Sequence, residues 1–224
     1  MHRVTLTVDS HSYPKALKRH LPALAPAEII VWGNLDILHH PSLAFFCSVK
    51  CPGSLILQTY DLARALRDAH IGVIGGFHSP MEKECLALLL RGKQPVIICP
   101  ARALQGMRLP KEWKSPLDQG RLLLLSPFED KLRRTTADLA QIRNKFVAAI
   151  AAAIFIAYAS EGGKSEHLSR EVLSWGKPLL TLPSPENARL IALGATPIAM
   201  DNFPEIIKKF PGIDSGPRIA GEGL

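Results

Sequence analysis

The sequence predicts an α/β fold built on a doubly wound, mainly parallel sheet of the Rossmann-like kind, and three observations lead to that prediction. Short apolar runs alternate with segments of helical apolar spacing along most of the 224 residues. Some runs, such as 95–99 and 122–125, are apolar throughout, which is typical of strands buried on both faces of a parallel sheet. Turns that contain Gly or Ser follow several runs and lead directly into helical segments.

These patterns divide the chain into a lead-in at 1–27, a Rossmann-like domain at 28–200, and a C-terminal helix with a loose tail at 201–224. Strands are predicted at 28–33, 43–47, 71–76, 95–99, 122–125, 153–158, 178–182 and 196–198. Helices are predicted at 55–66, 80–91, 135–150, 166–175 and 185–193. The Pro-containing stretch 100–120 is expected to be a long, partly helical connection.

Two of these helices have clear start signals. Ser79 is followed by Pro80 and Glu82, which together form the N-cap, the first-turn proline and the third-position glutamate of a capping box. Thr135 is the expected cap of the helix that ends at residue 150. The strand-helix-strand order around these helices requires right-handed crossovers and hence parallel strands.

The composition indicates a folded protein with an anionic partner. Hydrophobic residues make up 47% of the chain, and Lys and Arg outnumber Asp and Glu by 27 to 20. The resulting net charge of +7 favours nucleic acid or a nucleotide as the partner. The most apolar run, 146–159, is shorter than the roughly 20 residues that a membrane-spanning helix needs. We therefore expect a cytoplasmic protein without membrane association.

The four cysteines are expected to be reduced and free of metal. Cys47, Cys51, Cys85 and Cys99 lack the paired spacing of a zinc site, and no histidine cluster completes a set of four ligands. The sequence therefore predicts no metal and no cofactor.

Two polar loops are the candidate anion sites. Residues 48–53 follow the strand at 43–47, and residues 162–165 follow the strand at 153–158. Each loop leads into a helix, whose first N–H groups lack intrahelical partners and attract anions. In open parallel sheets ligands collect at the carboxyl ends of the strands. The two loops are therefore expected to face one crevice if their strands are neighbours.

The order of elements and the residues at their ends resemble the DprA/Smf (DNA-processing protein A) family, in the DprA/lysine-decarboxylase-like superfamily. The residues that carry this resemblance are 32–36, 47–50, 75–76, 143–144, 163–165, 176–184 and 187–195. The chain departs from the family at Cys47, which stands where a Gly is usual, and at Lys50, where the basic residue comes one place late. Residues 77–79 replace the family's usual Ala-x-Gly-Ile-Asp, and the accessory domains common in the family are not expected here.

The resemblance implies single-stranded DNA binding in a basic pocket and loading of a recombinase during natural transformation. Lys50, Arg143 and Lys164 are suited to phosphates, and Phe77 or His78 to stacking on bases. The candidate phosphate- or DNA-binding residues are Ser48, Lys50, Gly53, Gly75, Gly76, Phe77, His78, Arg143, Asn144, Gly162, Gly163, Lys164 and Ser165. No catalytic residue is predicted.

Two alternatives stay open. Residues 162–166 are also similar to the Gly-rich loop of the lysine-decarboxylase-like nucleotide phosphoribohydrolases, which cleave an N-glycosidic bond with the help of a Glu. The Glu position falls at Arg170 or Glu171, depending on a gap. The other alternative is a nucleotide-sensing regulatory protein.

The resemblance also implies a homodimer. Trp175 and the apolar face of Leu168, Val172 and Leu173 are the candidate contacts. The alternative is that all four residues pack on their own sheet.

Overall fold

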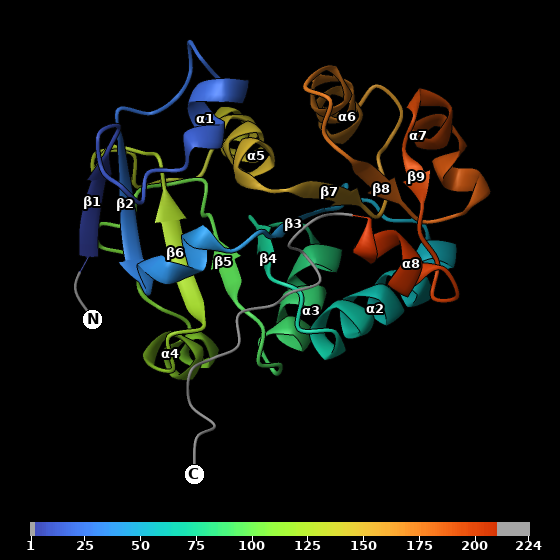
Figure 1. Cartoon of the computed structure of the whole chain (residues 1–224), viewed down its shortest axis with the longest axis horizontal. Helices are drawn as coiled ribbons and strands as arrows, with labels where there is room; N and C mark the ends of the chain where they lie inside the picture. Colours follow the sequence, from blue (N-terminus) through green and yellow to red (C-terminus); the bar gives the residue numbers. More distant parts are fainter. Residues whose placement is uncertain (1–2, 210–224) are drawn as a thin grey trace.

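A computed structural model of the chain describes residues 3–209 and confirms the predicted α/β class (Figure 1). The strands are β1 (Arg3–Thr7), β2 (Glu28–Gly33), β3 (Leu43–Phe46), β4 (Val73–Gly75), β5 (Val96–Ile98), β6 (Leu122–Ser126), β7 (Ala153–Ile156), β8 (Leu179–Thr181) and β9 (Thr196–Pro197). The predicted loose tail lies outside the described residues from 210 onward.

The helices connect successive strands, as the alternating sequence pattern predicts. The α-helices are α1 (Lys15–His20), α2 (Gly53–Asp68), α3 (Pro80–Leu89), α4 (Lys111–Asp118), α5 (Ala137–Ile150), α6 (Lys164–Ser174), α7 (Ala188–Leu193) and α8 (Phe203–Lys208). Two short 3-10 helices, η1 (Leu35–His39) and η2 (Pro185–Asn187), complete the order.

The sheet has the order β1-β2-β6-β5-β4-β3-β7-β8-β9. The chain adds β4, β5 and β6 on one side of β3, and α5 then returns it to β7 on the other side of β3. The winding direction therefore reverses between β3 and β7. In sheet order from β6 through β9, all neighbouring strands are parallel. β2 pairs antiparallel with both of its neighbours, β1 and β6. In such a sheet the crevice outside the carboxyl ends at the reversal is the expected ligand site.

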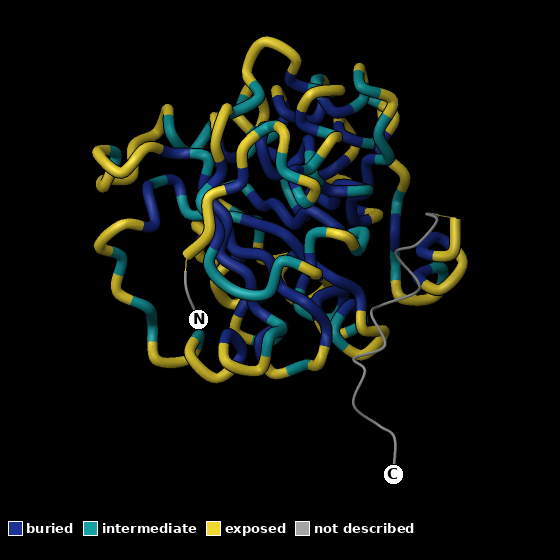
Figure 2. Tube along the Cα trace, turned by 60° about the vertical axis from the view of Figure 1, so that its left-hand side comes forward, coloured by how far each residue is buried: buried dark blue, intermediate teal, exposed yellow. Residues whose placement is uncertain are grey.

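Helices cover both faces of the sheet, so side chains of alternate strand residues enter two cores. One core contains Phe45 and Phe155 and packs against α2, α3, α4 and α8. The other contains Phe46 and Ile154 and packs against α1, α5, α6 and α7. Figure 2 shows the buried strands inside a rim of exposed loops. Burial on both faces explains why these strands read as continuous apolar runs.

The structure differs from the sequence prediction at the N-terminal end. Residues 3–27 are part of the domain, because β1 pairs with β2 over five residues of each strand. The Arg3 guanidinium also lies 4.8 Å from the centre of the Trp32 ring, a cation–π contact. The lead-in therefore supplies an edge strand, which the sequence reading missed because β1 is largely exposed.

The start of α3 is confirmed, and the start of α5 moves by one residue. Ser79 and Glu82 form the complete capping box, with Pro80 at the first helical position. Thr136, and not Thr135, caps α5, since its hydroxyl accepts from the Leu139 N–H at 3.2 Å.

Two further observations concern the helices and the cysteines of residues 3–209. No helix within residues 3–209 has the length and apolar character needed to span a bilayer. Cys47, Cys51, Cys85 and Cys99 are all free thiols, of which only Cys51 is incompletely buried.

Candidate functional site

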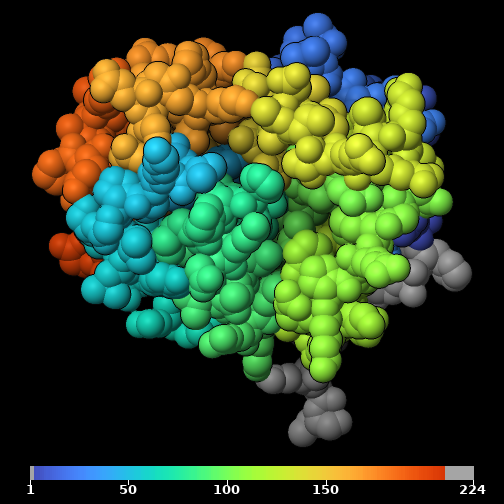
Figure 3. All heavy atoms as spheres, turned by 180° about the vertical axis from the view of Figure 1, so that it is seen from behind, coloured from blue at the N-terminus to red at the C-terminus, as the bar shows by residue number. Residues whose placement is uncertain are grey.

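The two predicted loops meet at the carboxyl ends of β3 and β7. Ser48 follows β3, and its hydroxyl lies 3.3 Å from the hydroxyl of Ser165 at the start of α6. The same Ser48 hydroxyl accepts from the Ser160 N–H at 3.0 Å, and the Ser48 N–H donates to the Tyr158 carbonyl at 2.9 Å. In Figure 3 the segments around residues 50 and 160, in cyan and orange, lie side by side. The two loops therefore meet where the sheet reverses its winding, and the crevice is the surface between them.

The loop before α6 is held in shape by its own glycines and by Glu166. Gly162 has a φ of +63°, which favours glycine, and a Cβ on Gly163 would lie 2.8 Å from the Ser160 carbonyl oxygen. The buried Glu166 carboxylate accepts from the Gly162 N–H at 3.1 Å and from Arg170 at 2.8 Å. Hydrogen bonds from Arg170 and then from Gly162 lower the pKa of Glu166. One N–H of this loop is therefore already used by the protein's own carboxylate.

The turn after β4 contains a second buried carboxylate. Glu82 accepts from the Cys47 N–H at 2.9 Å, the His78 N–H at 2.7 Å and the Ser79 N–H at 3.2 Å. These donors belong to the loops after β3 and β4, so one side chain ties both loops together. The sequence revealed Glu82 only as a capping residue; its contact with Cys47 depends on the neighbouring positions of β3 and β4.

Arg143 lies beneath the crevice and not on its surface. Its side chain is buried, with 3% of the residue exposed, and its Nη1 donates to the Cys99 carbonyl at 2.8 Å. Burial lowers the pKa of Arg143, and the nearby Glu82 opposes that shift. The guanidinium fills the space over Gly76, where an added Cβ would lie 1.3 Å from Nη1. Arg143 therefore supports the Gly76 turn, and in this conformation it is not available to a phosphate.

Phe77 is likewise part of the protein interior. Only 5% of the residue is exposed, its backbone has a φ of +46°, and its ring packs on Gly75. The expected use of Phe77 as a stacking platform does not fit this position. His78, the next residue, is exposed.

Lys50 and Lys164 are the exposed cations at the mouth of the crevice. Lys50 lies in the loop after β3, and Lys164 is the first residue of α6. Within residues 3–209 neither lysine forms an ion pair, and the Lys164 ammonium donates to the Ala137 carbonyl at 3.4 Å. Gly53, at the first position of α2, is exposed and has free space where a Cβ would be.

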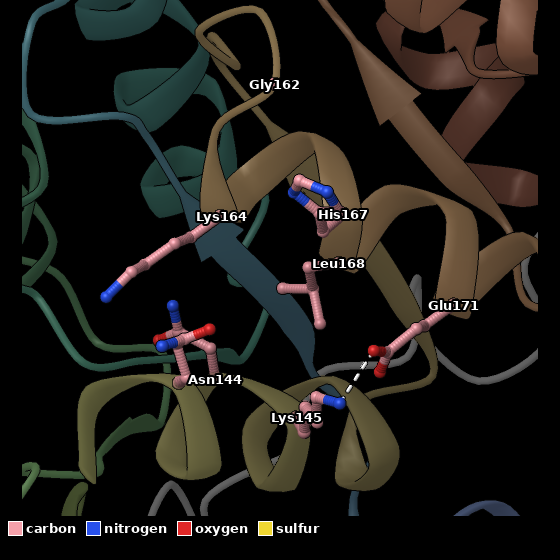
Figure 4. Close-up of a pocket in the computed structure, with 8 residues that line it drawn as sticks. Asn144, Lys145, Gly162, Lys164, His167, Leu168 and Glu171 are labelled. Carbon is pink, nitrogen blue, oxygen red and sulfur yellow. Dashed lines mark ion pairs between the residues drawn. The ribbon is translucent and has the colours of Figure 1, made fainter. Parts of the chain in front are cut away.

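A groove of about 380 Å³ runs between α5 and α6 beside this mouth. Figure 4 shows Lys164 and Asn144 at one end of the groove and Leu168 pointing into the gap between the helices. At the other end Lys145 and Glu171 form an ion pair of 2.6 Å. The lining residues are Gln141, Asn144, Lys145, Gly162, Lys164, His167, Leu168 and Glu171.

The sequence reading missed Gln141, Lys145, His167, Leu168 and Glu171 as a joint site. A signal for them was present, because residues 164, 167, 168 and 171 share one face of a helix, as do 141, 144 and 145. That these two faces oppose each other depends on the crossover of α5, which local spacing does not contain.

The predicted dimer contacts are only partly accessible. Leu168 and Val172 are buried in the core beneath α6, and Leu173 and Trp175 pack against that same core. The Trp175 ring also lies 5.4 Å from the His20 ring. These side chains pack within their own chain, as the alternative prediction had it.

Within the described part of the chain no group of three or more His, Cys, Asp and Glu is arranged to hold a metal ion. Glu171, one of the positions aligned with the hydrolase glutamate, is paired with Lys145. The two loops thus carry two exposed lysines, with a polar groove beside Lys164.

The fold is that of a Rossmann-like α/β protein whose sheet reverses its winding between β3 and β7. The sequence profile of the family described as DNA recombination-mediator protein A matches residues 4–210. The chain therefore belongs to the DNA recombination-mediator protein A family, as the resemblance predicted. No curated protein sequence matches it.

Solved structures of DNA processing protein A have the same fold. The chain superposes on DNA processing protein A from Streptococcus pneumoniae with a TM-score of 0.77 at 18% identity, over 92% of this chain and 74% of that chain. For the Helicobacter pylori protein, described by its single-stranded DNA binding mode, the TM-score is 0.76 at 20% identity, over 94% and 98%. A molybdenum cofactor binding protein from Rippkaea orientalis is more distant, with a TM-score of 0.54 at 9% identity, over 76% and 96%.

Proposed function

We propose that this protein binds single-stranded DNA along the crevice between the β3–α2 and β7–α6 loops. The observation that carries the proposal is the contact between Ser48 and Ser165, which brings the loops of Lys50 and Lys164 together. The two lysines are exposed and free of ion pairs within residues 3–209, so their charges are available to phosphates. Family membership supports a role in DNA processing.

A strand of nucleic acid suits this mouth better than a mononucleotide held deep in the crevice. The N–H groups of Cys47, His78 and Ser79, which form a natural anion seat, are already bound to Glu82. The open cations lie at the surface, where successive phosphates of one strand reach them. The Helicobacter pylori relative, which binds single-stranded DNA, supports the same choice.

Salt dependence of binding tests the proposal. Each phosphate neutralised by a lysine releases roughly 0.7 counterion from a single strand, so the slope of log affinity against log salt falls by about that amount per lysine removed. We expect Lys50→Ala and Lys164→Ala each to weaken binding of a labelled oligonucleotide and to flatten this slope. The measurement is fluorescence anisotropy over a range of salt concentrations.

Lys114→Ala is the matched control. Lys114 is exposed on α4, which packs at the amino end of β6, far from the crevice in the topology (Figure 1). Its removal is expected to leave the affinity and the slope unchanged. The proposal fails if the wild type does not bind at low salt, or if all three variants behave alike.

The two alternative functions have less support. For the phosphoribohydrolase, the aligned Glu171 is neutralised by Lys145. For a nucleotide sensor, Glu82 occupies the anion seat described above. Release of a free base from a nucleoside monophosphate, without binding of oligonucleotides, would favour the hydrolase.

We further propose that the protein acts in DNA uptake and recombination in the cytoplasm, as a homodimer and together with a recombinase. The support is membership of the DNA recombination-mediator protein A family. Co-sedimentation of a recombinase on protein-coated single strands is the direct test of that partner.

A further inference from the structure

Cys47 and Cys51 stand at the two ends of the loop that carries Lys50. Cys47 directly follows β3, and Cys51 comes two residues before the start of α2, so three residues separate them. Side chains alternate along a strand, and Cys47 therefore points into the same core as Phe45. Because α2 covers that core, the chain turns back toward Cys47 before the helix begins. The side chain of Cys51 packs against the same core as a result.

The thiols of Cys47 and Cys51 are in contact. Burial raises the pKa of Cys47, and the charge of the Cys51 thiol and a hydrogen bond with it raise that pKa further. Burial also raises the pKa of Cys51, but the hydrogen bond with Cys47 opposes this shift. Cys51 is thus the thiol of the pair that ionises more readily, and it is also the more exposed one.

The other two cysteines are closed to solvent. Cys85 lies on α3, is fully buried, and directs its Sγ toward the Thr59 carbonyl at 3.9 Å. Cys99 is buried in the opposite core. A thiol reagent therefore reaches this part of the protein only through Cys51.

We propose that Cys47 and Cys51 form a redox modification site, at which a low-molecular-weight disulfide such as oxidised glutathione converts the two thiols into one disulfide. The Cys51 thiolate attacks one sulfur of the reagent, which releases one thiolate and leaves a mixed disulfide on Cys51. Cys47 then gives up its proton and attacks the Cys51 sulfur, which releases the second thiolate. The two cysteines are oxidised, and the reagent is reduced to two thiols. Cys47 can take the second step although it is buried, because its target is the sulfur beside it.

Lys50 connects this site to the crevice. The lysine is exposed and immediately precedes Cys51, so a strand that binds Lys50 covers the path by which the reagent reaches Cys51. The phosphates of the strand also disfavour the thiolate through their negative charge. This connection rests on the proposed function of DNA binding, whereas the disulfide itself does not.

Mass spectrometry after incubation with oxidised glutathione tests the site. We expect the wild type to lose two hydrogen atoms, a peptide map to join Cys47 to Cys51, and a reductant to restore the original mass. Cys47→Ala lacks the second thiol and is expected to stop at the mixed disulfide, with one glutathione per chain. Cys51→Ser, at a half-buried loop position, guards against a folding defect in Cys47→Ala and is expected to keep its mass unchanged. Cys85→Ala is the control and is expected to form the disulfide as the wild type does.

Two results would overturn the site. One is a wild type that stops at the mixed disulfide, as Cys47→Ala does. The other is a disulfide that maps to Cys85.

The same reaction with a saturating single-stranded oligonucleotide tests the connection with DNA. The rate is expected to fall about tenfold when about nine tenths of the protein carries the strand, because only the free fraction reacts. An unchanged rate while the oligonucleotide is bound, as followed by anisotropy, would contradict a strand that passes over Cys51. If no oligonucleotide binds at low salt, the proposed function fails, and the disulfide is still decided by the masses.

Discussion

Gly76 and Arg143 depend on each other at the scale of single residues. The Arg143 guanidinium occupies the position where any other residue at 76 would place its Cβ, 1.3 Å from Nη1 and 1.8 Å from Cζ. The same guanidinium binds the Cys99 carbonyl. Gly76, directly after β4, is therefore needed for close packing against a buried cation. Its conformational freedom is not the reason, since Gly76 does not have a positive φ.

We expect Gly76→Ala to lower the free energy of unfolding by about 2–4 kcal/mol, because the added methyl displaces Arg143 and leaves buried polar groups unpaired. Urea denaturation followed by circular dichroism measures the change. Gly53→Ala is the matched control: nothing lies within 4 Å of its Cβ position, and the change is expected to stay within about 0.5 kcal/mol of zero. Equal stability of both variants would contradict the role of Arg143.

The four cysteines are expected to differ in reactivity. Burial raises the pKa of Cys85 and of Cys99 to about 12, and Cys47 is also buried. Thiolate is the reactive form, so these three are protected in the folded protein. Iodoacetamide at neutral pH should modify Cys51 alone, and all four cysteines after unfolding, as counted by mass spectrometry of peptides. Modification of Cys99 before unfolding would show that the core containing Phe46 and Ile154, to which Cys99 belongs, opens readily.

At the scale of elements, one charged side chain binds the C-terminus of α5, and another binds the loop just before the N-terminus of α6. The Lys177 ammonium donates to the carbonyls of Ala148, Ala149 and Ala151 at 2.7, 2.6 and 2.6 Å, at the C-terminus of α5. Glu166 binds the Gly162 N–H before the start of α6. Each charge has the sign that the helix dipole favours at its end.

Replacing Lys177 by Met removes the cation and leaves three carbonyls of α5 without this donor. We expect a loss of roughly 2 kcal/mol in the free energy of unfolding. Lys83→Met on the exposed face of α3 is the control and should change stability by less than about 0.5 kcal/mol. Both variants are measured by urea denaturation. An unchanged free energy of unfolding in Lys177→Met would mean that water hydrogen-bonds the three carbonyls as well as the ammonium does.

Glu166 makes the free energy of unfolding depend on pH, and the direction of that dependence follows from the shift of its pKa. Its pKa is lowered in the folded state, first by Arg170 and then by Gly162. The folded state therefore binds fewer protons than the unfolded state in the window below the ordinary Glu value of about 4.3. The contribution is complete above that value and is lost as the pH falls through the folded-state pKa.

We expect Glu166→Gln to be less stable than the wild type at neutral pH and to approach it as the pH falls below about 4. Urea denaturation between acid and neutral pH measures the difference. Glu205→Gln, at an exposed position in α8 without an ion pair in the described chain, should show a difference that is small and constant. A Glu166→Gln difference that does not change with pH would contradict the assigned hydrogen bonds.

At the scale of the whole molecule, the reversal of the winding between β3 and β7 creates the crevice. Strands that are 107 residues apart, counted from Phe46 to Ala153, become neighbours, and their loops bring Lys50 and Lys164 to one mouth. Two lysines can bind only a small number of DNA phosphates. A second copy of the chain would double that number and raise the effective concentration of the second site to the millimolar range.

We therefore expect a mass of twice 24.5 kDa in light scattering at micromolar concentration, and DNA affinity that falls when the protein is diluted below its dimerisation constant. Of the α6 residues predicted as contacts, Leu168 and Val172 are buried, so a dimer formed through this helix would depend on the half-buried Leu173 and Trp175. A monomer mass together with unchanged DNA affinity would remove the dimer from the proposal.

The sequence by itself determined the α/β class, most of the strands and helices, and the two loops. These features depend on local patterns: apolar runs for doubly buried strands, Ser79 with Glu82 for a helix start, and Gly or Ser before α2 and α6. The order of strands is not local, because β3 pairs with whichever strand the crossovers bring beside it. The sequence could therefore predict the two loops. It could predict that they meet only on the condition that β3 and β7 are neighbours in the sheet.

Only the tertiary structure decided which candidate side chains face solvent. Arg143 and Phe77 have residue types suited to DNA, yet both are buried, because α5 packs against the end of β4 and the Phe77 ring covers Gly75. The groove also depends on the tertiary structure. It lies between α5 and α6, two separate helices whose polar faces meet only after α5 has crossed the sheet. Burial and the pairing of distant surfaces are properties of the packed chain, and no residue pattern within one segment contains them.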